Sequence, residues 1–139
     1  GTTETSRKML GKALEARLFA DGKLVYFLGI GNVLYGVDAD IERKVENRTE
    51  HMRRLAEVAN IMLDAGFILI VTAAELAQAD LDVITAAVGP EMIETIWVGD
   101  QVTTDLACDL QIGEGEAEED ALEHIKQRLQ DANIIFRPW

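Results

Sequence analysis

The chain has 139 residues, 48% of them hydrophobic, with 25 acidic and 13 basic side chains and a formal net charge of -12. This length and apolar content are enough for a globular domain with its own core, and they exclude an intrinsically disordered chain. The acidic balance argues against general binding to nucleic acid or to an anionic membrane, because both require a positive protein surface.

The hydrophobic pattern alternates along the chain between helical spacing and continuous apolar runs. In chain order we predict a helix over 6–20, a strand over 24–28, a helix over 45–64, a strand over 67–72, a helix over 76–88, strands over 93–98 and 109–112, and a helix over 116–130. Strands that are apolar throughout are typical of a parallel sheet covered on both faces. The order therefore predicts an α/β fold with a mainly parallel sheet.

The cysteine content limits which cellular compartment and which cysteine-based sites are compatible with the sequence. Cys108 is the one cysteine, which excludes an internal disulfide and a cysteine-based zinc cluster. A single cysteine fits a reducing compartment, and neither a signal peptide nor a membrane span is visible in the sequence. We expect one cytoplasmic domain over residues 1–139, with no metal site and no nucleic-acid or membrane partner.

The first residues are similar to a phosphate-binding loop in which the key positions have changed. A P-loop reads G-x-x-x-x-G-K-[ST], and Gly1, Ser6, Arg7 and Lys8 stand at its four fixed positions. Ser6 lacks the conformational freedom of glycine, Arg7 keeps the charge but is planar, and Lys8 cannot offer Mg²⁺ a hydroxyl group. Taken alone, the segment is more typical of an ordinary helix N-terminus capped by Thr or Ser.

Two further segments carry a more specific resemblance. Arg53–Gly66 reads R-R-L-A-E-V-A-N-I-M-L-D-A-G, and adenylylsulfate kinases read R-R-x-x-E-V-A-x-x-x-x-D-A-G at this place. Upstream, the segment 27–36 resembles the L-D-G-D-N-V-R-x-G of the same family, and residues 1–15 align with its phosphate loop and first helix. The chain thus resembles adenylylsulfate kinases, which phosphorylate adenylylsulfate with ATP, over most of its length.

The resemblance implies a three-layer P-loop kinase-like fold and a set of binding positions. Candidate substrate-binding residues are Asn32, Arg48 and Arg53, and the degenerate phosphate loop comprises Gly1, Ser6, Arg7 and Lys8. It also implies ATP or ADP with Mg²⁺ as ligands, if the family activity survives. The family fold begins with an apolar strand ahead of this loop, and that first strand is missing from the chain. Because family members occur fused to other enzymes of sulfate activation, we expect this domain to be fused to, or associated with, another such domain.

The same resemblance indicates that several residues with functional roles in the family are replaced in this chain. Gly29-Ile30-Gly31-Asn32 stands where the family has D-G-D-N, Leu34 replaces an arginine, and the segment 75–81 loses two arginines but keeps Asp80. The connection 99–107 is also too short for the family's basic lid. Phosphoryl transfer depends on positioning and charge neutralisation, so we assign no catalytic residue.

Three hypotheses for the function remain open. The first is a degenerate domain with a structural or nucleotide-sensing role, which binds adenylylsulfate or 3′-phosphoadenylylsulfate. The second is an active kinase that uses altered residues, and the third is an unrelated P-loop-derived interaction domain. Each candidate residue also has an ordinary explanation. Arg53–Glu57 and Glu50–Arg54 are i,i+4 pairs of a solvated helix face, and Asn32 can equally cap a turn.

Overall fold

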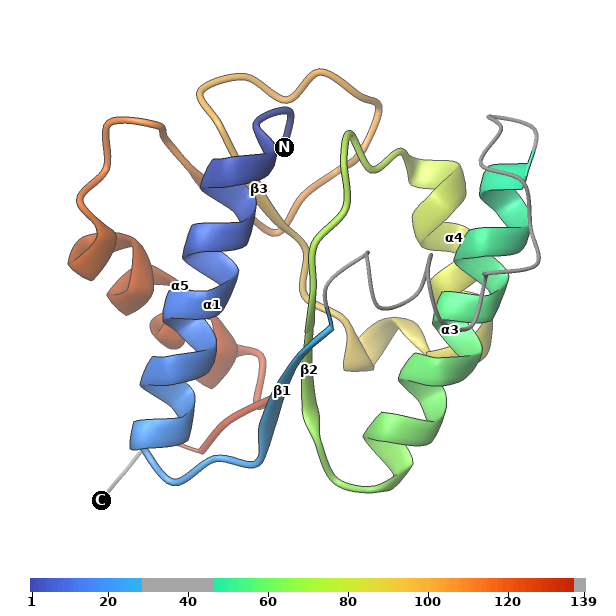
Figure 1. Cartoon of the computed structure of the whole chain (residues 1–139), viewed down its shortest axis with the longest axis horizontal. Coiled ribbons are helices and arrows are strands. Elements are labelled where there is room, and N and C mark those ends of the chain that lie inside the picture. Colours follow the sequence, from blue (N-terminus) through green and yellow to red (C-terminus); the bar gives the residue numbers. More distant parts are fainter. Residues whose placement is uncertain (29–46, 137–139) are drawn as a thin grey trace.

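A computed structural model of the chain describes residues 1–28 and 47–136 as helices packed around short parallel strands (Figure 1). The elements are α1 (Glu4–Ala20), β1 (Val25–Leu28), α3 (Arg48–Asp64), β2 (Ile68–Val71), α4 (Gln78–Val88), the 3₁₀ helix η3 (Pro90–Met92), β3 (Ile96–Val98), β4 (Leu110–Ile112) and α5 (Glu118–Asp131). The predicted order of helices and strands is confirmed. The strands are shorter than predicted.

Some predicted boundaries were wrong for identifiable reasons. The helix predicted from residue 76 begins at Gln78, because Ala77 has an extended backbone with φ -98° and ψ 164°. The strand predicted from residue 93 begins at Ile96, because residues 90–92 form η3 and the Thr95 N–H donates to the Asp109 carboxylate at 2.8 Å. α1 ends as predicted, with Gly22 in the left-handed region at φ 82°.

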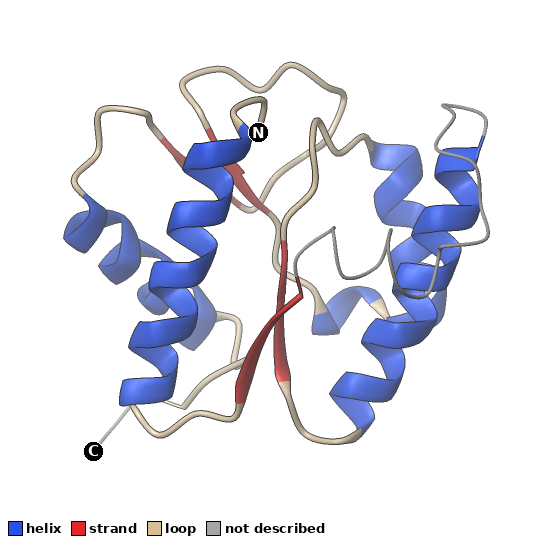
Figure 2. Cartoon of the chain, viewed as in Figure 1, coloured by secondary structure: helices blue, strands red, loops and turns tan. Residues whose placement is uncertain are grey.

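The strands pair as two separate half-sheets (Figure 2). β1 pairs in parallel with β2, with Val25 opposite Ile68, and β3 pairs in parallel with β4, with Ile96 opposite Leu110. The prediction of parallel strands is confirmed. Among the described residues no strand joins β2 to β3, so the mainly parallel sheet, predicted to lack its first strand, is divided into two pairs of strands.

Helices cover both faces of the strands, as the apolar strand sequences predicted. α1 and α5 lie on one face, and α3 and α4 lie on the other (Figure 1). Successive side chains of β2 alternate between the two layers, as in any strand. Ile68 and Ile70 pack against the α1–α5 core, whereas Leu69 and Val71 pack against the core formed with α3. The arrangement is therefore three layers of helix, strand and helix.

Within residues 1–28 and 47–136, each helix falls short of the length and apolar character needed to cross a bilayer.

A buried leucine of α5 tests the α1–α5 core. Leu122 is 3% exposed, and Leu122→Ala is expected to lower the free energy of unfolding by about 2–5 kcal/mol, since it leaves a cavity. The matched control is Ile61→Ala on α3, whose side chain is 69% exposed and whose loss should change stability by about 0.5 kcal/mol or less. Urea unfolding measures both; equal losses would contradict this core.

Candidate functional site

The segment 72–78, which we call the 72–78 turn, follows β2 and is held by three separate parts of the chain. The Ala74 carbonyl accepts a hydrogen bond from Arg48 Nη2 at 3.0 Å, and the Glu75 N–H donates to the Gly1 carbonyl at 3.1 Å. From the loop 99–109, the Thr104 hydroxyl donates to the Leu76 carbonyl at 2.7 Å. The start of α3, the loop 99–109 and the predicted phosphate loop therefore meet at the carboxyl end of β2. Open α/β folds bind their ligands at this end of the strands.

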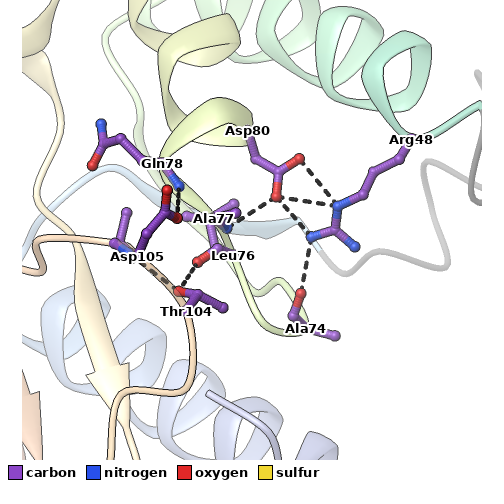
Figure 3. A network of polar contacts seen from close by, with 9 residues as sticks. Arg48, Ala74, Leu76, Ala77, Gln78, Asp80, Thr104 and Asp105 are labelled. Carbon is purple, nitrogen blue, oxygen red and sulfur yellow. Dashed lines mark hydrogen bonds and ion pairs between the residues drawn. The ribbon is translucent and has the colours of Figure 1, made fainter.

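Arg48, a predicted binding residue, is held by a carboxylate of α4 (Figure 3). Its Nε lies 3.1 Å from both oxygens of Asp80, and its Nη2 lies 2.9 Å from Asp80 Oδ2. Asp80 is 9% exposed and also accepts the Ala77 N–H at 3.0 Å, so its carboxylate is well satisfied. The Arg48 side chain remains 40% exposed, which leaves an accessible face of an already oriented guanidinium.

The environment of Asp80 favours its charged form. Burial raises the pKa of Asp80, but the hydrogen bonds from Arg48 and from the Ala77 N–H outweigh burial and hold the pKa below its usual value. Folding therefore gains stability from this carboxylate at pH values above its unfolded pKa. The gain is lost as the pH falls through the lower pKa of the folded state.

The side chain of Arg7 forms a hydrogen bond within the predicted phosphate loop. Arg7 Nη1 donates to the Gly1 carbonyl at 2.8 Å, while its Nε is buried and has no hydrogen-bond partner within residues 1–28 and 47–136. Gly1 is confined because a β-carbon at this position would lie 2.0 Å from the Val98 carbonyl oxygen. Of the other two positions, Ser6 is half-buried and Lys8 is exposed on α1.

Arg53 is engaged on its own helix rather than at the turn. Its guanidinium lies 2.9 and 2.7 Å from the Glu50 oxygens and 2.6 Å from Glu57 Oε1. Arg54 Nε lies 2.9 Å from Glu50 Oε1, so both predicted i,i+4 pairs are confirmed. The hydrogen bonds from the two arginines lower the pKa of Glu50 to about 2. Asn32, the third predicted binding residue, lies outside the described residues, as do Gly29–Gly31 and Leu34.

Residues of the loop 99–109 were missed as part of this site. Asp105 Oδ1 accepts the Gln78 N–H at 2.9 Å, which places a second carboxylate beside Asp80 at the N-terminus of α4. A helix N-terminus favours negative charge, so both carboxylates stabilise α4. Thr104 and Asp105 are residue types that commonly cap helices, but nothing in their local sequence says which helix they reach.

Metal ligands are not assembled in the part of the chain that the structure describes. No group of three or more His, Cys, Asp or Glu side chains there could hold a metal ion. On α1, Lys8 occupies the position at which a P-loop supplies a hydroxyl, and a protonated amine cannot ligate a cation. The described residues at this place therefore do not fit Mg²⁺ through side-chain ligands.

Comparisons with known proteins agree on one family. The sequence model described as adenylylsulphate kinase matches residues 1–94. The adenylyl-sulfate kinase of Shewanella amazonensis is 38% identical over 95 residues, which cover 68% of this chain and 48% of that protein. The bifunctional enzyme NodQ of a Rhizobium species is 38% identical over 72 residues, or 52% of this chain and 11% of the enzyme. The chain thus spans at most about half the length of these curated relatives.

A solved structure extends the likeness of fold to almost the whole chain. The Mycobacterium tuberculosis APS kinase CysC, in complex with AMPPNP and APS, superposes with a TM-score of 0.77. The match covers 94% of each chain at 16% sequence identity, so it shows the fold alone.

Removing the charge of Asp80 tests the ion pair beside the turn. Asp80→Asn is expected to lower the free energy of unfolding by about 1–3 kcal/mol at pH 7, because Arg48 loses its charged partner. Below about pH 4 the difference between variant and parent should shrink, since the parent carboxylate is then protonated in the unfolded state.

The control for this prediction is an exposed ion pair. Glu57→Gln removes one partner of Arg53 on the surface of α3 and should cost only a few tenths of a kcal/mol. Urea unfolding between about pH 3 and 8 measures both variants. A deficit of Asp80→Asn that is the same at every pH would contradict the ion-pair interpretation.

Proposed function

Because the chain belongs to the adenylylsulfate kinase family, we propose that it is a nucleotide-sensing domain of sulfate activation that binds its ligand without transferring phosphate. The ligand is adenylylsulfate or 3′-phosphoadenylylsulfate, and ADP or ATP can occupy the neighbouring phosphate position. One contrast carries the proposal. The binding arginine Arg48 is kept and oriented beside the 72–78 turn, whereas phosphate-loop positions are replaced.

The geometry around Arg48 supports anion binding at the turn. Asp80 fixes the guanidinium from one side, and an arginine oriented in this way loses less conformational entropy when it binds a ligand. Gly1 and Arg48 contact neighbouring residues of the same turn, Glu75 and Ala74. A ligand with a sulfate or phosphate group near Arg48 would therefore lie close to the N-terminal turn of α1, where backbone N–H groups favour anions.

The same region supports the loss of phosphoryl transfer. Arg7, at the position of the P-loop lysine, donates to the Gly1 carbonyl and so uses part of its guanidinium within the loop. Lys8 supplies no hydroxyl for Mg²⁺. Phosphoryl transfer needs the metal and the cations to neutralise the developing charge together, so their losses multiply. We therefore derive no transfer step for this chain.

Other features of the proposal follow from the family rather than from measured contacts. Asn32 and Arg53 remain candidates for contacting adenylylsulfate, although Arg53 would have to leave Glu50 or Glu57 to do so. Fusion to another sulfate-activation domain is supported by the bifunctional relative NodQ. A cytoplasmic location and a single domain over residues 1–139 complete the proposal.

Calorimetry tests the binding. Adenylylsulfate and 3′-phosphoadenylylsulfate, each with and without Mg-ADP, are titrated into the chain, and saturable binding of at least one is expected. Arg48→Ala should weaken that binding about 10- to 100-fold, which corresponds to losing one charged hydrogen bond. Arg17→Ala is the matched control, because Arg17 pairs with Glu119 between α1 and α5. Absence of heat from folded protein would contradict the proposal.

A coupled assay tests the absence of chemistry. With Mg-ATP and adenylylsulfate, the chain is expected to form no 3′-phosphoadenylylsulfate above the level of a protein-free blank. The reason is that Arg7 replaces the P-loop lysine and Lys8 replaces the residue whose hydroxyl binds Mg²⁺. The full-length Shewanella kinase run in parallel shows that the assay works. Mg²⁺-dependent turnover that Arg48→Ala abolishes would instead identify an active kinase with altered residues.

A further inference from the structure

The loop 99–109 is anchored at both ends beside β3 and β4. The Gly99 N–H donates to the Ile112 carbonyl at 2.8 Å. At the other end, Asp109 Oδ2 accepts hydrogen bonds from the N–H and the hydroxyl of Thr95, at 2.8 and 2.9 Å. The loop therefore starts and finishes at fixed places, which limits where its middle residues can lie.

Two adjacent residues in the middle of this loop bind the 72–78 turn (Figure 3). The Thr104 hydroxyl donates to the Leu76 carbonyl at 2.7 Å and accepts the Leu106 N–H at 3.3 Å. Asp105 Oδ1 accepts the Gln78 N–H at 2.9 Å. Leu106, the next residue, is only 7% exposed, so its burial keeps Thr104 and Asp105 against the turn.

The contacts from the loop lie beside the groups that orient Arg48. Ala74, whose carbonyl accepts a hydrogen bond from Arg48 Nη2 at 3.0 Å, stands two residues before Leu76. Asp80, whose Oδ2 lies 2.9 Å from the same Nη2, stands two residues after Gln78 in the first turn of α4. The loop therefore fixes the backbone on both segments that hold the guanidinium.

Glu75 separates the contact at Arg48 from the contact at the loop, and its backbone is strained. Its φ is 45°, in a region that costs a non-glycine residue on the order of 1 kcal/mol or more. Such a conformation persists only where neighbouring contacts impose it. On one side the Ala74 carbonyl is bound by Arg48, and on the other the Leu76 carbonyl is bound by Thr104. Loss of the Thr104 contact would let the turn relax at Glu75 and would shift the carbonyl that holds Arg48.

We propose that Thr104 and Asp105 are positioning residues that prepare Arg48 for an anionic ligand. This inference rests on the proposed function, because it concerns how the same site binds adenylylsulfate or 3′-phosphoadenylylsulfate. The two residues act on the acceptors of Arg48 rather than on the ligand. An arginine whose acceptors are fixed loses less conformational freedom on binding, so the affinity for the ligand is higher.

The same coupling makes the loop 99–109 a reporter of occupancy. If docking of the loop raises the affinity for the ligand by some factor, the ligand strengthens that docking by the same factor. Gln101, Thr103 and Asp105 are exposed, so the change occurs on a surface that another domain can contact. A nucleotide-sensing domain needs such a surface, because occupancy has to alter something outside the site.

Calorimetry with adenylylsulfate and with 3′-phosphoadenylylsulfate tests the positioning role. Thr104→Val removes the hydroxyl and should weaken binding about fivefold, the equivalent of one hydrogen bond. Thr104→Ser keeps the hydroxyl and should bind within about twofold of the parent. The matched control is Thr85→Val on α4, which removes a hydroxyl that donates to the Asp82 carbonyl at 3.1 Å and should also stay within about twofold.

Three further measurements separate positioning from a general loss of stability. In an Arg48→Ala background, Thr104→Val should change the affinity by less than about twofold, because its effect passes through Arg48. In the ligand-free protein, Thr104→Val should speed hydrogen exchange at Arg48 Nε at least about threefold, whereas Thr85→Val should not. Saturating adenylylsulfate should slow exchange of the Gln78 N–H, which donates to Asp105, at least about threefold.

Equal affinities of Thr104→Val and the parent would overturn the proposal, as would an equal loss of affinity with and without Arg48. Unchanged exchange of the Gln78 N–H on addition of ligand would overturn the reporting role. If no ligand binds the parent but exchange at Arg48 Nε still responds to Thr104→Val, the proposed function fails while the positioning of the arginine stands. Should Thr104→Val not fold, Asp105→Ala removes the second contact from an exposed position, with the same expectations.

Discussion

The 72–78 turn is the constraint on which the candidate site depends. Ala74, Glu75 and Leu76 each give a backbone group to a different segment: to Arg48, to Gly1 and to Thr104. These three hydrogen bonds link α3, the phosphate loop and the loop 99–109 to the segment that follows β2. Glu75 has a φ of 45°, in a region that costs a non-glycine residue on the order of 1 kcal/mol or more. The surrounding contacts hold this conformation.

The candidate site gathers basic side chains, although the chain as a whole is acidic. The protein carries a formal net charge of -12, but Arg7, Lys8 and Arg48 belong to the segments that meet at or beside the turn. Two of these cations already have internal acceptors, Arg48 on Asp80 and Arg7 on the Gly1 carbonyl. We propose that these oriented groups bind an anion without supplying the charge neutralisation that phosphoryl transfer requires.

The division of the sheet connects the site to the core. The Gly1 carbonyl accepts the Glu75 N–H beyond the end of β2, and a β-carbon at Gly1 would meet the carbonyl of Val98 at the end of β3, so the phosphate loop contacts both half-sheets. An apolar cavity lies between the half-sheets, and the buried Nε1 of Trp97 in its wall has no hydrogen-bond partner among the described residues.

Much of the fold follows from the sequence by itself, because its signals are local. Apolar residues at helical spacing and uninterrupted apolar runs predicted the element order, the parallel pairing and helices on both faces. The pairs Arg53–Glu57 and Glu50–Arg54 followed from helix geometry alone. The family resemblance also came from short motifs in the first two thirds of the chain.

Only the tertiary structure decided which distant groups meet. Arg48 and Asp80 are 32 residues apart, and Thr104 and Leu76 are 28 apart, so neither contact leaves a periodic trace in the sequence. The apolar runs by themselves did not predict the split into two half-sheets, because an apolar run shows that a strand is buried on its faces but not which strand lies at its edge; only the family resemblance indicated a missing strand. Pairing at an edge is made by backbone groups that every residue carries. Sequence therefore determines which surfaces are buried, and the folded chain determines which partners they bury against.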